Sequence, residues 1–154
     1  MAAITPVRLT VDRHALTVLG RVFDAAQPAE GCALLLGTTG SSWHLRSVWP
    51  CLNVWPQPAE RSRRFSLDPR EQLLAQRWAR QRGLAVLGAG HSHPCSAPVP
   101  SAVDRALTVA PALLLIAGRA PESPRWCWEC WWLPASEPDD PAATPQRLPW
   151  TMDG

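Results

Sequence analysis

The sequence contains no lysine and no tyrosine, so every basic residue is an arginine. These arginines are scattered along the chain, and we interpret their exclusive use as a coding preference without mechanistic meaning. The formal net charge is only +2, which is too small to favour a nucleic acid as the partner. We therefore expect a protein that does not bind nucleic acid.

Long hydrophobic runs are also lacking. No apolar stretch approaches the ~18 residues of a membrane-spanning helix, and the N-terminal residues lack the basic start and apolar centre of a signal peptide. The five cysteines are odd in number and irregularly spaced, which excludes a regular disulfide framework. Together these absences predict a cytoplasmic protein with reduced thiols and no membrane partner.

The length of 154 residues suits one domain with a proper core. We place this domain at residues 1–133. From Pro134 onward the chain is rich in proline, alanine and aspartate and has no periodicity. Residues 134–154 are therefore expected to form a flexible tail.

Hydrophobic periodicity predicts a mixed α+β fold, in which helices pack on a sheet. One helix is expected over residues 11–26. A second begins after the N-cap Asp68, with Glu71 completing a capping box, and ends at Gly83. A short third helix is expected over 101–107. The predicted strands cover residues 32–37, 43–49, 84–93, 111–118 and 125–133.

The stretch GHSHPCSAPVPSAVD, residues 90–104, carries the strongest chemical signal. His91 and His93 end a predicted strand, where side chains two residues apart share a face. Two neutral imidazoles suit zinc, and Asp104 in the following helix is the candidate third ligand. Such a set leaves the fourth position open for water, as in a catalytic zinc site.

Ser101 precedes Asp104 by three residues, so both share one face of the predicted helix. Its hydroxyl could stabilise a developing oxyanion. The same S-x-x-D pattern is also an ordinary helix-capping signature, and the two roles are compatible. A histidine pair or a single aspartate has an ordinary structural interpretation too. Only their joint occurrence predicts a metal site.

An open zinc site also requires a carboxylate that moves protons without binding the metal. Glu30 is the candidate, because it stands directly before an apolar strand, where an unpaired carboxylate is costly. Taken alone, Glu30 would be interpreted as a solvated loop residue.

The combined pattern resembles the JAMM (MPN+, Mov34/JAB) zinc metalloprotease family, and in particular its small prokaryotic members. The matching parts are Glu30 in PAEGCALLLG, then His91 and His93 in HSHP, seven residues, and Ser101 with Asp104 in S-x-x-D. The resemblance extends from about residue 7 to about residue 132. The order Glu30-Gly31-Cys32-Ala33 departs from the usual family segment, in which glycine follows the cysteine.

The resemblance implies a cytidine-deaminase-like JAB/MPN domain with a curved mixed sheet flanked by helices. It implies one zinc ion bound by His91, His93 and Asp104, with Glu30 as general acid and base and Ser101 stabilising the tetrahedral intermediate. The implied activity is hydrolysis of a peptide or isopeptide bond after the C-terminal glycines of a ubiquitin-like protein. Because no long insertion is visible, processing of a sulfur-carrier tail is favoured over selective deubiquitination.

Two alternatives remain open: a zinc amidohydrolase acting on a small molecule or peptide, and a non-catalytic MPN scaffold. Scaffold members usually lack the metal ligands, whereas this chain has kept them all. The sequence identifies neither the carrier nor the group released, and it leaves a homo-oligomer open.

The remaining features are interpreted as structural. The pair Cys127 and Cys130 lacks a second C-x-x-C, and on a strand the two would face opposite ways, so no second metal site is expected. His14 and His44 have no evident partners. The tryptophans of RWCWECWWL are expected to pack in the core, with a docking surface as the alternative. They are Trp126, Trp128, Trp131 and Trp132.

Overall fold

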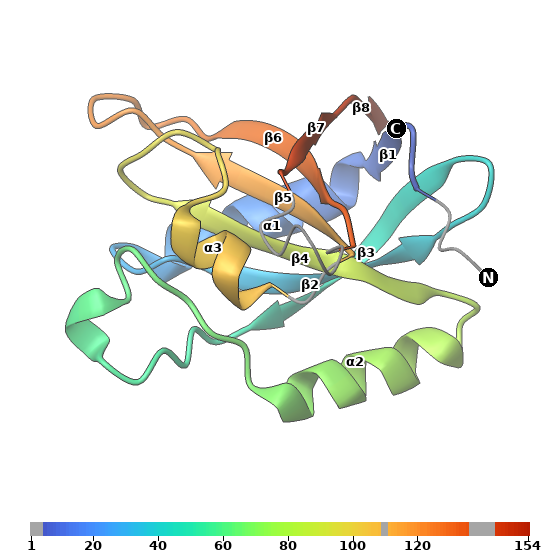
Figure 1. Cartoon of the computed structure of the whole chain (residues 1–154), viewed down its shortest axis with the longest axis horizontal. Coiled ribbons are helices and arrows are strands. Elements are labelled where there is room, and N and C mark those ends of the chain that lie inside the picture. Colours follow the sequence, from blue (N-terminus) through green and yellow to red (C-terminus); the bar gives the residue numbers. More distant parts are fainter. Residues whose placement is uncertain (1–4, 109–110, 136–143) are drawn as a thin grey trace.

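The computed structural model describes residues 5–108, 111–135 and 144–154. Its centre is an eight-stranded mixed sheet in the order β7-β6-β5-β4-β2-β3-β1-β8 (Figure 1). The helices are α1 (Arg13–Ala26), α2 (Pro69–Arg80) and α3 (Ala102–Leu107), with a single 3₁₀ turn at Pro58–Glu60. The strands are β1 (Leu9–Asp12), β2 (Cys32–Thr38), β3 (Trp43–Cys51), β4 (Ala85–His93), β5 (Ala112–Gly118), β6 (Cys127–Leu133), β7 (Gln146–Leu148) and β8 (Trp150–Asp153).

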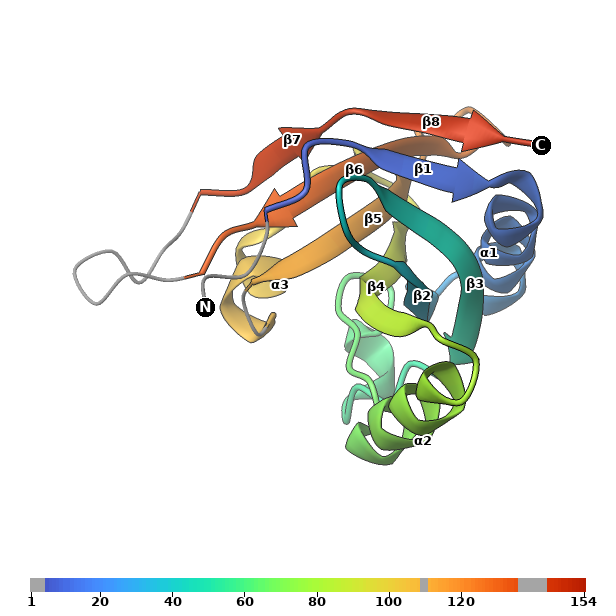
Figure 2. The same ribbon diagram turned by 90° about the vertical axis from the view of Figure 1, so that its right-hand side faces the viewer.

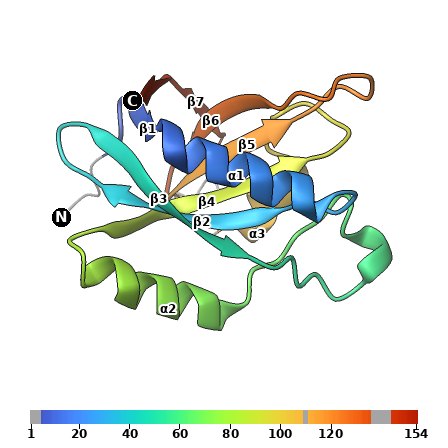
Figure 3. The ribbon, with the colours of Figure 1, turned by 180° about the vertical axis from the view of Figure 1, so that it is seen from behind.

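Strand β2 is apolar throughout because both of its faces are covered. Leu35 belongs to the main core, which includes the buried Leu19 and Phe23 of α1. Leu34 and Leu36 alternate to the opposite side, where the buried alanines of α2 cover them. Figure 3 shows α1 lying across the sheet in front, with α2 below it in this view. The predicted α+β fold, a curved mixed sheet flanked by helices, is confirmed.

Helix α2 begins after the predicted N-cap Asp68, but the predicted capping box with Glu71 does not form. The side chain of Asp68 accepts a hydrogen bond from the main chain of Arg70, and Gly83 has the positive φ (70°) of a residue that ends a helix. Glu71 does not complete a capping box. Its carboxylate instead accepts a hydrogen bond from the Trp49 indole at 2.6 Å, because β3 passes beside the first turn of the helix.

Both ends of the chain depart from the sequence-based expectation. The first helix starts at Arg13, and Leu9–Asp12 before it form strand β1, which lies between β3 and β8. The expected tail is likewise not loose where the structure describes it: β7 pairs with β6, and β8 pairs with β1. These short strands form because they pair with neighbouring strands and because Leu148 is buried. Both causes are tertiary contacts. The other part of that tail, residues 136–143, lies outside the described residues.

Strands β7 and β8 are separated only by Pro149, yet they pair at opposite ends of the strand order. The sheet must therefore curl until its two edges meet, and Figure 2 shows β7 and β8 running as one strap over β6 and β1. The main chain of Leu9 donates to the carbonyl of Pro149 at 2.9 Å. Inside the curl, the rings of Trp43 and Trp132 are in contact edge to face, 5.5 Å apart.

We expect this strap to contribute to global stability. Leu148→Ala should lower the free energy of unfolding by about 2 kcal/mol or more, because the leucine is 5% exposed and its loss leaves a cavity. Met152→Ala, at a position that is 44% exposed, is the matched control and should change stability by less than about 0.5 kcal/mol. Urea denaturation measures both variants. Equal effects would contradict a structural role for the strap.

The tryptophans of β6 and the residue before it mostly pack inward. Trp126 and Trp128 lie 6.2 and 5.8 Å from the Phe23 ring on α1, and Trp132 is buried. The core-packing interpretation is confirmed for these three residues, whereas the half-buried Trp131 lies outside the core cluster and its indole donates to the carbonyl of Pro98 at 2.9 Å. Cys127 is exposed while Cys130 is buried, so the two thiols face opposite sides of β6.

Among the described residues, no helix has the length and apolar character needed to cross a membrane.

Candidate metal centre

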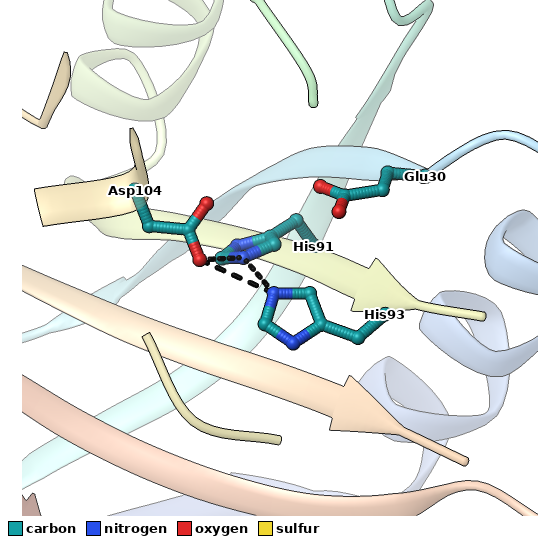
Figure 4. Close-up of side chains that lie close together, drawn as sticks. All are labelled: Glu30, His91, His93 and Asp104. Carbon is teal, nitrogen blue, oxygen red and sulfur yellow. Dashed lines mark hydrogen bonds and ion pairs between the residues drawn. The ribbon is translucent and has the colours of Figure 1, made fainter. Parts of the chain in front are cut away.

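Four buried side chains from three parts of the fold converge at one end of β4 (Figure 4). His91 and His93 come from the end of β4, Asp104 from the first turn of α3, and Glu30 from the loop before β2. Each side chain offers a ligand atom, and these atoms all lie within 4.8 Å of one another. The structure thus brings together all four residues that the sequence placed at the metal.

The sheet register explains why these residues meet. His91 is paired with Cys32 of β2 and with Ile116 of β5, so it lies in the middle of the sheet. The position of Glu30, two residues before Cys32, brings its carboxylate to the same end of the sheet. Between the two histidines, Ser92 faces the other way and accepts a hydrogen bond from the main chain of Gly31 at 2.8 Å. The predicted alternation along β4 is therefore confirmed.

Two glycines allow neighbouring segments to pack closely around the site. A Cβ atom at Gly118 would lie 2.4 Å from the main-chain nitrogen of Pro98, so only glycine lets the loop after His93 cross β5 this closely. At Gly31 a Cβ atom would lie 2.8 Å from the Phe23 ring. This contact accounts for the glycine that follows Glu30.

The atoms of His91, His93 and Asp104 form a nearly equilateral triangle. His91 Nε2 lies 3.1 Å from His93 Nε2 and 3.0 Å from Asp104 Oδ2, and His93 Nε2 lies 3.2 Å from the same oxygen. Ligands of a tetrahedral zinc, at ~2.0–2.1 Å from the metal, are about 3.3 Å apart. The triangle therefore has the dimensions of one face of a zinc coordination shell.

The protonation of this triangle also suits a cation. His93 Nδ1 lies 2.8 Å from the carbonyl oxygen of Ala97, which can only accept. Nδ1 therefore carries the proton, and in the neutral ring Nε2 presents a lone pair to the centre of the triangle. Two nitrogens and a carboxylate oxygen are a donor set that zinc uses in catalytic sites. The residues present fit a zinc ion.

Glu30 lies beside the triangle and outside it. Its carboxylate faces the two imidazoles in Figure 4, and its buried Oε1 has no hydrogen-bond partner within the described residues. Burial raises the pKa of Glu30 from its ordinary value of 4.5 to about 8, with the nearby His93 lowering it and Asp104 raising it. Such a carboxyl group can take up and release a proton near neutral pH.

Burial and hydrogen bonds also shift the pKa values of Asp104, His91 and His93. Burial disfavours the ionised form of Asp104, but hydrogen bonds from the two imidazoles hold its pKa below the usual range. Burial lowers the pKa of His91. For His93, burial acts in the same direction, but the hydrogen bonds with Asp104 and Ala97 outweigh it and raise the pKa. Asp104 is therefore ionised and ready to bind a cation.

Ser101 has the capping role that the sequence allowed. Its hydroxyl oxygen accepts from the main chain of Asp104 at 3.0 Å, and its own main chain donates to Asp104 Oδ2 at 2.9 Å. This reciprocal pair fixes the Asp104 carboxylate towards the two histidines. The effect of Ser101 on an oxyanion remains a prediction.

A second group of possible ligands lies at the far end of the strap. It consists of Asp12, His44 and Asp153. His44, which was expected to have no partner, has its Nε2 atom 2.6 Å from Asp12 Oδ1. Asp153 is exposed, and exposed carboxylates commonly occur without an ion. We assign no metal site to this group.

The sequence analysis missed Phe65. Its ring stacks on the imidazole of His91, with centroids 4.5 Å apart and an interplanar angle of 25°. Phe65 lies in a segment without periodicity, so no local pattern could have placed it there. The family resemblance extends over this segment, but its motif residues do not include Phe65.

Comparison with known proteins agrees with the geometry. The profile of a family described as prokaryotic homologs of the JAB domain matches residues 13–133. A desampylase from Pyrococcus furiosus is 30% identical over 119 residues, covering 77% of this chain and 79% of that protein. A desampylase from Haloferax volcanii is 36% identical over 78 residues, covering 51% and 53%.

Solved structures give the same result for the fold. The solution structure of a protein from Desulfitobacterium hafniense is 27% identical, with a TM-score of 0.77, and the match covers 94% of this chain and 92% of that one. A protein from Salinibacter ruber is 26% identical, with a TM-score of 0.60, and the match covers 89% and 88%.

Proposed function

The chain belongs to the family of prokaryotic JAB-domain homologues, and from this premise we propose that it is a zinc-dependent peptidase or isopeptidase. The observation that carries the proposal is the convergence of His91, His93 and Asp104, with a second carboxylate, that of Glu30, held beside them. When bound to these three residues, zinc would supply a Lewis acid that acidifies water and polarises the scissile carbonyl.

Glu30 would move the proton. It would accept a proton from the attacking water and then deliver it to the nitrogen of the leaving amine, which needs a proton to depart. Its burial beside the metal ligands supports this role, because a carboxyl group whose pKa is raised to about 8 holds and releases protons near neutral pH.

Ser101 would act on the other side of the reacting carbonyl. Its oxygen already accepts a hydrogen bond from the main chain of Asp104, so its hydroxyl proton can be donated elsewhere. Directed at the tetrahedral intermediate, that proton would stabilise the developing negative charge. Through its main-chain nitrogen, Ser101 also keeps Asp104 Oδ2 facing the histidines.

The substrate we propose is a ubiquitin-like protein, cleaved after its C-terminal glycines. The two relatives named desampylase support an isopeptide bond to a ubiquitin-like modifier as the scissile bond. The narrower proposal, a ubiquitin-like sulfur carrier, comes from the family resemblance and from the lack of long insertions. A small-molecule or peptide amide is the alternative substrate for the same site.

Purified protein is expected to contain about one zinc per chain, and chelation should abolish its turnover. Elemental analysis measures the metal. Cleavage of carrier–peptide and carrier–protein conjugates, compared with small amides, measures the substrate class. Turnover of small amides alone would contradict the carrier substrate. Full partner binding by metal-free protein, with no turnover of any amide by zinc-loaded protein, would favour a scaffold.

A further inference from the structure

The segment 53–66, here called the site loop, holds the main chain of Glu30 from both sides. The main-chain nitrogen of Glu30 donates to the carbonyl of Arg61 at 2.7 Å. Its carbonyl oxygen accepts from the side-chain amide of Asn53 at 3.0 Å. Asn53 is the only asparagine in the sequence, and this contact places its side chain against the main chain of Glu30.

The same asparagine closes the site loop on itself. Its Nδ2 atom also donates to the carbonyl oxygens of Arg64 at 2.9 Å and of Arg61 at 3.4 Å. Its Oδ1 atom accepts from the main-chain nitrogens of Trp55 at 3.1 Å and of Ser66 at 3.2 Å. An asparagine side chain combines donors and an acceptor, which aspartate cannot do when ionised. One side chain thus joins both ends of the loop to Glu30.

The main-chain contacts matter because the Glu30 carboxylate has little else to fix it. Its Oε1 atom has no hydrogen-bond partner within the described residues. The next residue, Gly31, is anchored to Ser92 through both of its main-chain polar groups. The position of the carboxylate is therefore set by its anchored main chain. The site loop anchors Glu30, and Ser92 anchors Gly31.

The site loop also reaches a metal ligand. The ring of His93 is oriented by the hydrogen bond of its Nδ1 atom to Ala97. His91 lacks such a bond, because its buried Nδ1 atom has no partner in the described part of the chain. Phe65, stacked on the His91 ring at 4.5 Å, takes over this orienting role by packing. Partners of this kind tune a metal ligand without touching the metal.

We propose that the site loop is the positioning element of the metal centre, with Asn53 positioning Glu30 and Phe65 positioning His91. Both are positioning residues and neither contacts the substrate. The proposal rests on the proposed function for its kinetic consequences, while its structural consequences can be measured without any substrate.

Asn53→Ala and Asn53→Asp are expected to lower kcat by about 10- to 100-fold, since a displacement of 1 Å can cost 10²-fold. The KM and the zinc content should stay at the wild-type values, because the metal ligands are untouched. In zinc-loaded protein, hydrogen exchange at the Glu30 amide should become at least tenfold faster. Asp68→Ala, which loses the cap bond and the ion pair that Asp68 makes with Arg70, is the matched control and should leave kcat and this exchange unchanged.

Phe65→Leu is expected to weaken zinc binding by about 10-fold and to alter the visible absorption of cobalt-substituted protein. Phe65→Tyr keeps a flat ring on His91 and should restore both. Trp55→Phe changes an aromatic ring of the same loop and is the control. An unchanged cobalt spectrum and unchanged zinc affinity in Phe65→Leu would overturn the role of Phe65.

These outcomes separate the two proposals. If wild-type protein cleaves conjugates and Asn53→Ala cleaves them equally fast, the positioning role of Asn53 is wrong and the proposed function stands. If zinc-loaded wild-type protein cleaves no amide, the proposed function fails, and the exchange of the Glu30 amide and the cobalt spectra still decide the positioning role. Slow exchange in Asn53→Ala, equal to wild type, would overturn it.

Discussion

Glu30→Gln is expected to lower kcat for conjugate cleavage by roughly 10²–10⁴-fold, the range that general acid–base catalysis contributes. Glutamine has the same shape but cannot take up the proton of the attacking water. Because Glu30 lies outside the triangle of His91, His93 and Asp104, the zinc content should remain near one per chain. Steady-state kinetics together with elemental analysis measure both quantities. Full activity in this variant would exclude Glu30 as the proton carrier.

The stability of metal-free Glu30→Gln, compared with metal-free wild type, tests the burial of the Glu30 carboxyl group independently of turnover. The pKa of Glu30 is about 8 in the folded protein and 4.5 ordinarily, so the unfolded chain ionises first as the pH rises. The contribution of Glu30 to the stability of metal-free wild-type protein therefore falls between pH 4.5 and about 8, and this loss is complete above pH 8. Glu30→Gln does not titrate, so it should become more stable than wild type across this window, by the order of a few kcal/mol. Denaturant unfolding at pH 5 and pH 8.5 measures the difference.

Asp104→Ala is expected to abolish zinc binding and turnover together. Asp104 Oδ2 lies at one corner of the triangle, 3.0 and 3.2 Å from the two imidazole nitrogens, and its loss leaves only two ligands. The affinity for zinc should fall by more than the roughly 10–100-fold that loss of an outer partner costs. Titration with zinc in the presence of a competing chelator measures it. Retention of wild-type affinity would show that Asp104 is not a ligand.

Asp104 also takes part in the capping box of α3, so its replacement affects the fold as well as the metal. Ser101→Ala is the matched control, because it removes the cap hydroxyl and keeps the carboxylate. It should cost about 0.5–2 kcal/mol of stability and retain zinc. If Ser101→Ala lost zinc to the same degree as Asp104→Ala, the loss would follow from unfolding of the helix terminus.

The candidate metal ligands could be predicted from the sequence because their spacing is local. His91 and His93 are two residues apart on one strand, and the alternation of a strand places both on one face. Asp104 follows Ser101 by three residues at the start of a helix, where S-x-x-D has a defined geometry. Glu30 was found because the family motif includes it and because a carboxylate before a buried strand requires an explanation.

Other parts of the site could not be found in this way. Asn53 and Phe65 lie in a loop without a repeating pattern, and their contacts with Glu30 and His91 form only when distant segments pack. Glu71 was assigned to a cap because the local sequence permits one, yet the Trp49 indole from β3 binds it. The local sequence shows which partners a side chain can have, and packing against the neighbouring strand determines which of them it binds.

The sequence by itself determined the family resemblance, the main helices and the buried strands, together with the residues of the candidate metal centre, because each depends on short periods or fixed spacings. Only the tertiary structure decided the short strands β1, β7 and β8, the strap that closes the curled sheet, and the anchoring of Glu30. These features depend on contacts between residues far apart in the chain. Their free energy comes from burial and pairing that exist only after the sheet has formed.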